Sequence, residues 1–237
     1  MQSVAKMNSF IMSGKYSEFV ISLKKQDFDI IPTEPIKTFP LPEQLHADMQ
    51  ILKINNDIFV LNEAQYLINC IKSYGNINIC KNKAGEKYPE NVLLNFLYLN
   101  NRLYGKETAL DPILREYCKN NHIQVVNINQ GYSRCSTLVI NDYAVITADL
   151  SIAKAMKNYG VDVLVISSGN IVLEGYDYGF IGGASGKLND ESVIFFGNIK
   201  KHPDYTAIKA FLYKHKSDMI IACEDMPLTD IGGIVKI

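Results

Sequence analysis

Cys135 is the side chain of this sequence best suited to covalent chemistry. It follows Arg134, and a neighbouring cation favours the thiolate, the nucleophilic form of cysteine. His46 and Asp48 stand two residues apart in an earlier segment and could supply a base and the carboxylate that orients it. A Cys-His-Asp site then requires that Cys135 lie close to His46 and be open to solvent. The competing interpretations are a small buried cysteine and a turn histidine bonded to the backbone.

Four acidic residues could bind a substrate or a cationic ligand. Asp48, Glu90 and Asp230 stand in three separate turn segments, and Glu174 belongs to a long loop, residues 167–178, that could form a lid. Carboxylates that face one centre would favour a cation. The same acidic residues could instead cap turns, and Arg134 could either contact the substrate or neutralise them.

Composition narrows the class of protein. The chain has 237 residues, 47% of them apolar, and a net charge of -1 with scattered Lys and Arg, which argues against nucleic acid and anionic membranes as partners. No stretch is long enough to span a membrane, and residues 1–10 do not resemble a signal peptide, so a cytoplasmic location is expected. We expect a small-molecule ligand; the oligomeric state stays open.

The cysteines favour neither a disulfide framework nor a structural zinc site. Their number is odd, and none form a Cys-x-x-Cys pair. No His, Asp or Glu spacing indicates a metal, and no nucleotide-binding fingerprint is present, so no metal or cofactor is predicted. The five cysteines are Cys70, Cys80, Cys118, Cys135 and Cys223.

The elements that must position these side chains recur five times. Similar segments begin at residues 46, 88, 132, 180 and 230, a spacing of about 42 to 50 residues. A repeat of this size is typical of propellers and arrays, because one unit cannot bury its apolar face alone. Five units favour a closed ring, in which the turn segments meet at the centre. The predicted architecture is an α/β propeller of five ββαβ-type repeats with pseudo-fivefold symmetry, a single domain over residues 1–237.

Each unit places a helix between two strands. The apolar pattern and the capping residues predict helices over 17–25, 64–74 and 149–159, and from about 111 and 204. Ser17 is expected to cap the first helix. Pairing of residues 234–237 with the strand at 9–12 would close the ring and remove both exposed edges.

Five such units with Gly or acidic residues in their turns resemble the pentein fold. That superfamily of guanidino-group-modifying enzymes includes arginine and agmatine deiminases, dimethylarginine dimethylaminohydrolase and amidinotransferases. The chain also resembles a bacterial family of the same fold to which no reaction is attached. The resemblance implies a site at the ring centre with a Cys nucleophile, a His acid/base and acidic residues that hold a guanidinium.

The turns match this pattern only in part. Asp48 fits an acidic position of the family, and Glu90 resembles its Glu-Gly-Gly-Asp segment without the glycines. The third turn, where the family has its His, contains Arg134 and Cys135 instead. In the fifth turn Lys236 stands where the family pattern Gly-Gly-x-x-Cys has its nucleophile.

Two hypotheses follow. The first is a cysteine-dependent hydrolase or transferase acting on a small guanidine, amidine or amide compound, with Cys135 attacking, His46 transferring protons, and carboxylates binding the substrate. The second is a noncatalytic pentein that binds a small cationic ligand or a protein partner.

Overall fold

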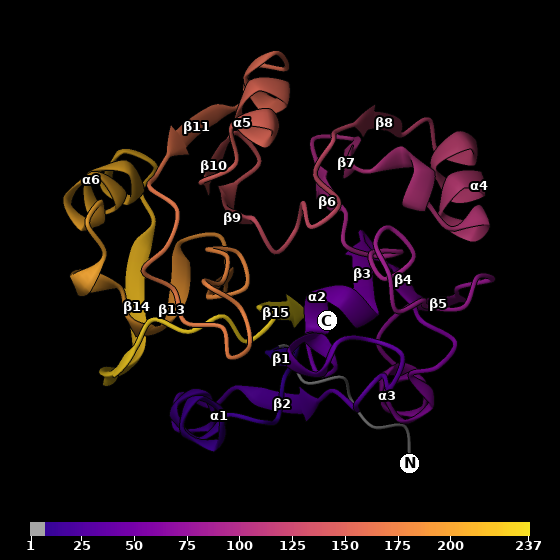
Figure 1. Ribbon diagram of the computed structural model, residues 1–237, viewed down its shortest axis with the longest axis horizontal. Coiled ribbons are helices and arrows are strands. Elements are labelled where there is room, and N and C mark those ends of the chain that lie inside the picture. The colour runs from indigo at the N-terminus through magenta and orange to yellow at the C-terminus, as the bar shows by residue number, and fades with distance from the viewer. Residues whose placement is uncertain (1–7) are drawn as a thin grey trace.

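Five three-stranded sheets repeat one plan in the computed structural model, which describes residues 8–237. The first strand of each sheet pairs antiparallel with the central strand, and the central strand pairs parallel with the third. In Figure 1 the sheets follow one another around the middle of the molecule. The sheets are β15-β1-β2 (Ile234–Lys236, Ser9–Met12, Asp29–Pro32), β3-β4-β5 (Ile51–Ile54, Asp57–Val60, Asn76–Ile79), β6-β7-β8 (Leu97–Leu99, Arg102–Gly105, Gln124–Asn127), β9-β10-β11 (Thr137–Asn141, Ala144–Thr147, Asp162–Val165) and β12-β13-β14 (Ser185–Lys187, Ser192–Asn198, Asp218–Pro227).

A helix connects the central strand of each sheet to its third strand, as the repeat predicts. The connecting helices are α1 (Ser17–Lys24), α3 (Gln65–Ile71), α4 (Pro112–Asn120), α5 (Leu150–Lys157) and α6 (Tyr205–Lys214). Four short helices lie outside this plan: α2 (Ala47–Gln50), η1 (Leu41–Glu43), η2 (Glu107–Ala109) and η3 (Ile199–Lys201). Parallel neighbours need such crossover connections.

Side-chain caps fix the starts of two of the five connecting helices, α4 and α5. Asp111 accepts a hydrogen bond from the backbone N–H of Ile113, and Asp149 accepts from Ser151 and Ile152. The predicted cap at Ser17 is wrong, because Ser17 is already helical and Tyr16 precedes it without a side-chain cap. The Ser17 hydroxyl donates to Glu18 instead.

Asparagine forms the tight turns between first and central strands. Asn100 and Asn101, between β6 and β7, have φ angles of 48° and 55°. Asn55, between β3 and β4, has a φ of 54°. Asparagine tolerates this left-handed region, which matches the twist of two-residue hairpins. These turns fix where β3 and β6 end.

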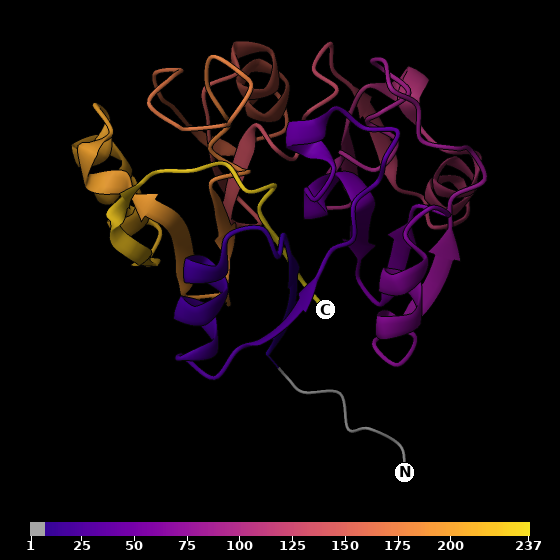
Figure 2. The same ribbon diagram turned by 60° about the horizontal axis from the view of Figure 1, so that its bottom comes forward.

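The predicted pairing of the chain ends is confirmed. β15 lies antiparallel to β1, with Phe10 opposite Lys236 and Met12 opposite Ile234. Figure 2 shows the yellow C-terminal segment returning to the indigo strands at the start of the described chain. Residues 1–7 of the predicted domain, and most of the segment tested for a signal peptide, lie outside the described residues.

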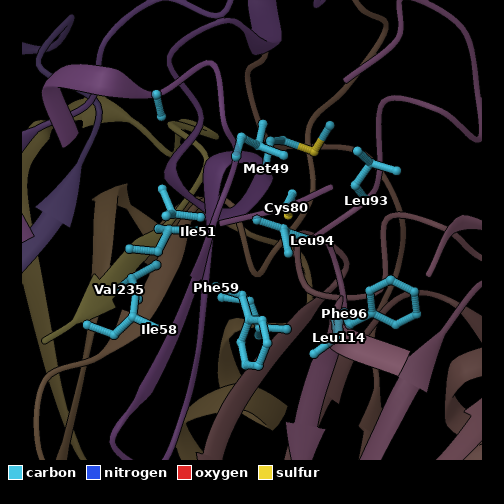
Figure 3. Packing of buried hydrophobic residues seen from close by; sticks show 14 of the residues in the cluster. Met49, Ile51, Ile58, Phe59, Cys80, Leu93, Leu94, Phe96, Leu114 and Val235 are labelled. Atoms are coloured by element: carbon cyan, nitrogen blue, oxygen red, sulfur yellow. The ribbon is translucent and has the colours of Figure 1, made fainter. Parts of the chain in front are cut away.

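Apolar side chains fill the space between neighbouring sheets. The largest buried cluster joins β3, β4, α3 and α4, and includes Met49, Phe59 and Phe96 (Figure 3). Val235 of β15 belongs to the same cluster, so the last strand shares the core of the second sheet.

All five cysteines are free thiols. Among the described residues, no helix has the length and apolar character needed to cross a membrane.

Candidate functional site

Five chain segments meet in the middle of the molecule, each directly before the first strand of a sheet. They are residues 46–50, 91–95, 133–136, 180–183 and 230–233. Backbone hydrogen bonds tie them together: Gly183 N–H donates to the Cys135 carbonyl, and Gly233 N–H donates to the Gly183 carbonyl. A side chain at Gly183 would overlap the carboxylate of Asp230, so glycine is required for this approach.

The structure brings Cys135, His46 and Asp48 together from two of these segments. One potential ligand atom of each residue lies within 4.8 Å of the others. All three residues are buried, and Cys135 is only 2% exposed. The proximity required of a Cys-His-Asp site is therefore present, whereas the required opening to solvent is absent.

Asp230 is the second carboxylate of this cluster. One of its oxygens lies 3.9 Å from Nδ1 of His46 and accepts a hydrogen bond from Gly232 N–H. The other oxygen accepts from Phe180 N–H at 2.8 Å. Two backbone donors therefore hold the carboxylate in place beside the His46 ring.

Asn95 positions Cys135, and sequence reasoning missed it. Its amide oxygen accepts the backbone N–H groups of Arg134 and Cys135, at 2.9 and 3.2 Å, and its amide nitrogen lies 2.9 Å from the Cys135 sulfur. The sequence feature that could have identified Asn95 is its place as a single polar residue in the apolar run Val92-Leu-Leu-Asn-Phe-Leu. Asn95 stands two residues before β6, just as Cys135 stands two residues before β9.

Burial dominates the charge of Asp48. It raises the pKa of this carboxyl to about 7, and the Asp230 carboxylate adds to the rise, while His46, Cys135 and Arg134 oppose it. Within residues 8–237, neither carboxylate oxygen of Asp48 has a hydrogen bond of good geometry. The Cys135 thiol is nevertheless close enough to favour the charged form of Asp48. Asp48 is consequently poised to gain or lose a proton near neutral pH.

The thiol of Cys135 is not activated by Arg134 in this conformation, contrary to the sequence-based expectation. Burial and the carboxylates of Asp48 and Asp230 raise its pKa well above the ordinary value. Arg134 donates through Nη2 to the carbonyl of Ile234 at 3.0 Å, and burial lowers its own pKa. The resting thiol is therefore protonated, because desolvation outweighs the neighbouring cation.

Glu90 and Glu174 are not brought to the central cluster. Glu90 is exposed and packs beside Gly85, at a shallow pocket that Lys81 and Lys83 also line. Glu174 has a side chain that is 79% exposed and forms a salt bridge with Lys15 at 2.8 Å. Both charges face solvent, where carboxylates are normally found.

A polar cluster of Glu43, Asn91, Tyr132 and Tyr176 adjoins the buried site. The Tyr176 hydroxyl donates to Glu43 at 2.5 Å, and the Tyr132 hydroxyl lies 2.6 Å from the Asn91 amide nitrogen and 3.4 Å from both Glu43 oxygens. Burial raises the pKa of Tyr132, and Cys135 contributes electrostatically to that rise. This cluster joins the 167–178 loop to η1 next to Cys135.

The Cys-His-Asp set could also hold one metal ion. Thiolate, imidazole and carboxylate are ligands that zinc accepts, and the three atoms are close enough to share one ion. Spacing along the sequence did not predict this, because His46 and Cys135 belong to different units.

A cavity of about 610 Å³ runs along the first strands of the sheets. Asp48 and Arg134 line it where the strands begin, and Lys53, Lys187 and Lys236 line it further along β3, β12 and β15. The cavity walls thus carry more basic than acidic side chains.

The chain has a pentein-like fold, which solved structures of several pentein enzymes share. It is similar to dimethylarginine dimethylaminohydrolase from Pseudomonas aeruginosa, a cysteine-to-serine mutant complexed with citrulline (TM-score 0.58, 11% identity, 98% of this chain and 99% of that chain). It is also similar to agmatine deiminase from C. jejuni (TM-score 0.58, 8% identity, 98% and 93%). A third similar structure is inosamine-phosphate amidinotransferase from Streptomyces griseus (TM-score 0.56, 10% identity, 96% and 91%).

Residues 11–235 match the family described as "Family of unknown function (DUF6873)", and the chain belongs to that family. Comparison with curated proteins found no match.

Proposed function

We propose that this protein is a cysteine-dependent hydrolase or transferase that acts on a small guanidine or amidine compound. The observation that carries the proposal is the meeting of Cys135, His46 and Asp48 within 4.8 Å, with Asp230 next to His46. The pentein-like enzymes to which the chain is similar include a deiminase and an amidinotransferase, which supports the same class of substrate. The proposal takes the five sheets as one closed, single-domain ring, which the pairing of β15 with β1 supports.

The carboxylates would hold the cationic group of the substrate. A guanidinium between Asp48 and Asp230 would lower their mutual repulsion and also lower the pKa of the Cys135 thiol, because those two carboxylates help to raise it. Substrate binding would thus generate the thiolate that the resting protein lacks.

The reaction would proceed in two balanced steps. The Cys135 proton passes to His46, and the thiolate sulfur attacks the amidine carbon, forming an S–C bond. Protonated His46 donates to the leaving amine as its C–N bond breaks. Water, or an acceptor amine in a transferase, then attacks the same carbon and gives a proton to neutral His46. The S–C bond breaks, and His46 returns that proton to the Cys135 sulfur.

A second candidate function is binding without chemistry. The burial of Cys135 and its raised pKa favour this alternative, because an unreactive buried thiol is the ordinary state of free cysteine. A ligand would then be held without being cleaved.

Product release separates the two candidates. The protein is incubated with arginine, agmatine and N-methylated arginine, and released ammonia or methylamine is measured. We expect turnover that Cys135→Ser abolishes, with a Cys135-bound intermediate visible by mass spectrometry. Cys118→Ser is the matched control, since Cys118 is a buried thiol of α4 outside the site. Equal turnover in Cys135→Ser would contradict the mechanism, and a thermal shift without turnover would favour binding alone.

A further inference from the structure

The cavity along the first strands carries a surplus of positive charge. Lys53, Arg134, Lys187 and Lys236 contribute four cations, whereas Asp48 and Asp190 are its two acidic residues. Asp190 is 98% exposed and already pairs with Lys187 at 2.9 Å. Asp48, at the other end, is buried and only partly ionised near neutral pH. The cavity is consequently cationic in its middle, opposite in sign to the cationic-ligand expectation from sequence.

Lys53 is the cation least compensated by acidic groups, and Lys236 is its basic neighbour. Within residues 8–237, Lys53 has neither a hydrogen-bond acceptor nor an acidic partner, and burial and Lys236 lower its pKa. Lys236 donates to the carbonyl of Leu188 at 3.1 Å, lies over the ring of Phe10 and also interacts electrostatically with the exposed Asp190 carboxylate. Neighbouring ammonium groups without a carboxylate between them destabilise a fold. Such an arrangement is explained if an anion binds between them.

Three different sheets supply the lysines, which surround a space rather than a flat surface. Lys53 comes from β3, Lys187 from β12 and Lys236 from β15, and backbone strands hold each position. Leu138 and Val235 add apolar wall between them. A volume of about 610 Å³ exceeds a single inorganic ion and suits a small organic molecule.

We propose that this cavity binds a small multivalent oxyanion, a phosphate or polycarboxylate compound, between Lys53, Lys187 and Lys236. The anion site adjoins the site proposed for Cys135, because Asp48 lines the cavity, but the three lysines lie further along the strands and Cys135 and His46 do not line the cavity. It would therefore exist whether or not the protein is an enzyme.

Calorimetric titration with pyrophosphate and with citrate, at constant ionic strength, tests the proposal. We expect saturable binding of at least one, weakened about fivefold or more in Lys53→Gln and in Lys236→Gln. Tighter binding of pyrophosphate identifies a phosphate compound as the ligand, and tighter binding of citrate identifies a polycarboxylate. The matched control is Lys154→Gln, an exposed lysine of α5 outside the cavity, which should bind as the wild type does.

Thermal melting shows that any loss of binding is not a loss of fold. Without anion, Lys53→Gln should melt no lower than the wild type, because the substitution removes an uncompensated cation; with anion, its stabilisation should be smaller. Cys135→Ser should bind the anion normally, which separates failure of this site from failure of the proposed catalysis. Absence of saturable binding for both probes, or equal binding by the two lysine variants and the wild type, would overturn the proposal.

Discussion

Burial raises the pKa of two groups at the centre of this protein, the Asp48 carboxyl and the Cys135 thiol. Asp48 and Cys135 lie among segments that exclude water, so each keeps its proton to a higher pH than a free side chain would. Asp230, equally buried, instead receives two backbone N–H groups. The two aspartates therefore differ in their hydrogen bonds, because neither Asp48 oxygen has a hydrogen-bond partner among residues 8–237.

Asp48→Asn should change how stability depends on pH. The pKa of Asp48 is about 7 in the folded protein against 3.8 ordinarily, so between these values the folded chain holds a proton that the unfolded chain has lost. The free energy of unfolding of the wild type then falls as pH rises from 4 to 7. The variant cannot ionise, so we expect equal stability near pH 4 and an advantage of about 2 to 4 kcal/mol at pH 8, measured by urea unfolding.

Asp149→Asn provides a control of opposite sign. Burial would raise the pKa of Asp149, but hydrogen bonds from Ser151 and Ile152 outweigh burial and lower it. Its stabilisation is present at neutral pH and is lost as pH falls through the folded-state pKa, so the variant should be less stable than the wild type at neutral pH. Parallel pH profiles for Asp48→Asn and the wild type would show that Asp48 does not titrate as described.

At the scale of elements, a loop and a short helix cover the site. The 167–178 loop is held in its middle by the bridge between Val172 and Thr229. Its Gly175 packs against Pro42 of η1, and Tyr176 donates to Glu43 of the same helix. The loop tip is held by these two contacts and by the exposed salt bridge between Lys15 and Glu174, so local opening would cost less than global unfolding.

Tyr176→Phe should expose Cys135 more often. Loss of the hydrogen bond to the Glu43 carboxylate would raise the rate of Cys135 alkylation about fivefold or more, measured by peptide mass mapping so that each cysteine is followed separately. Tyr143→Phe serves as the control, because Tyr143 is a largely exposed tyrosine of a distant hairpin. An unchanged rate at Cys135 would mean that this loop does not control access.

At the scale of the whole molecule, the two ends of the described chain form one sheet. β15 follows all the other units, yet it completes the sheet of β1 and β2. Its Ile234 and Val235 are buried, and the Ile234 carbonyl accepts from Arg134 beside the central site. Stability and the geometry of the site therefore depend on the same strand.

Deletion of residues 233–237 should lower the melting temperature by about 10 °C or more. The deletion exposes the edge of β1 and removes two buried aliphatic side chains, a loss of about 5 kcal/mol. Calorimetry measures the effect, and Tyr213→Ala, at a side chain exposed on α6, should leave the melting temperature unchanged. An unchanged melting temperature in the deletion variant would show that the β15–β1 pairing adds nothing to stability.

Local signals in the sequence were sufficient to predict the repeat, the helices between strands and the pairing of the chain ends. Asp111 and Asp149 cap the helices they precede, and apolar runs mark the strands, because capping and periodicity act over a few residues. The repeat also predicted that turn segments would meet, which placed Cys135 and His46 near each other.

Only the tertiary structure decided the electrostatic character of the site. The pKa of Cys135 is raised mainly by burial among the central segments. This effect of burial outweighs the effect of Arg134, the preceding residue in the sequence. Likewise, Glu90 and Glu174 face solvent and three lysines line the cavity because strand direction and loop path orient each side chain. Burial and the combined effect of charges from distant segments are fixed by tertiary packing, so residue types and spacing alone could not predict them.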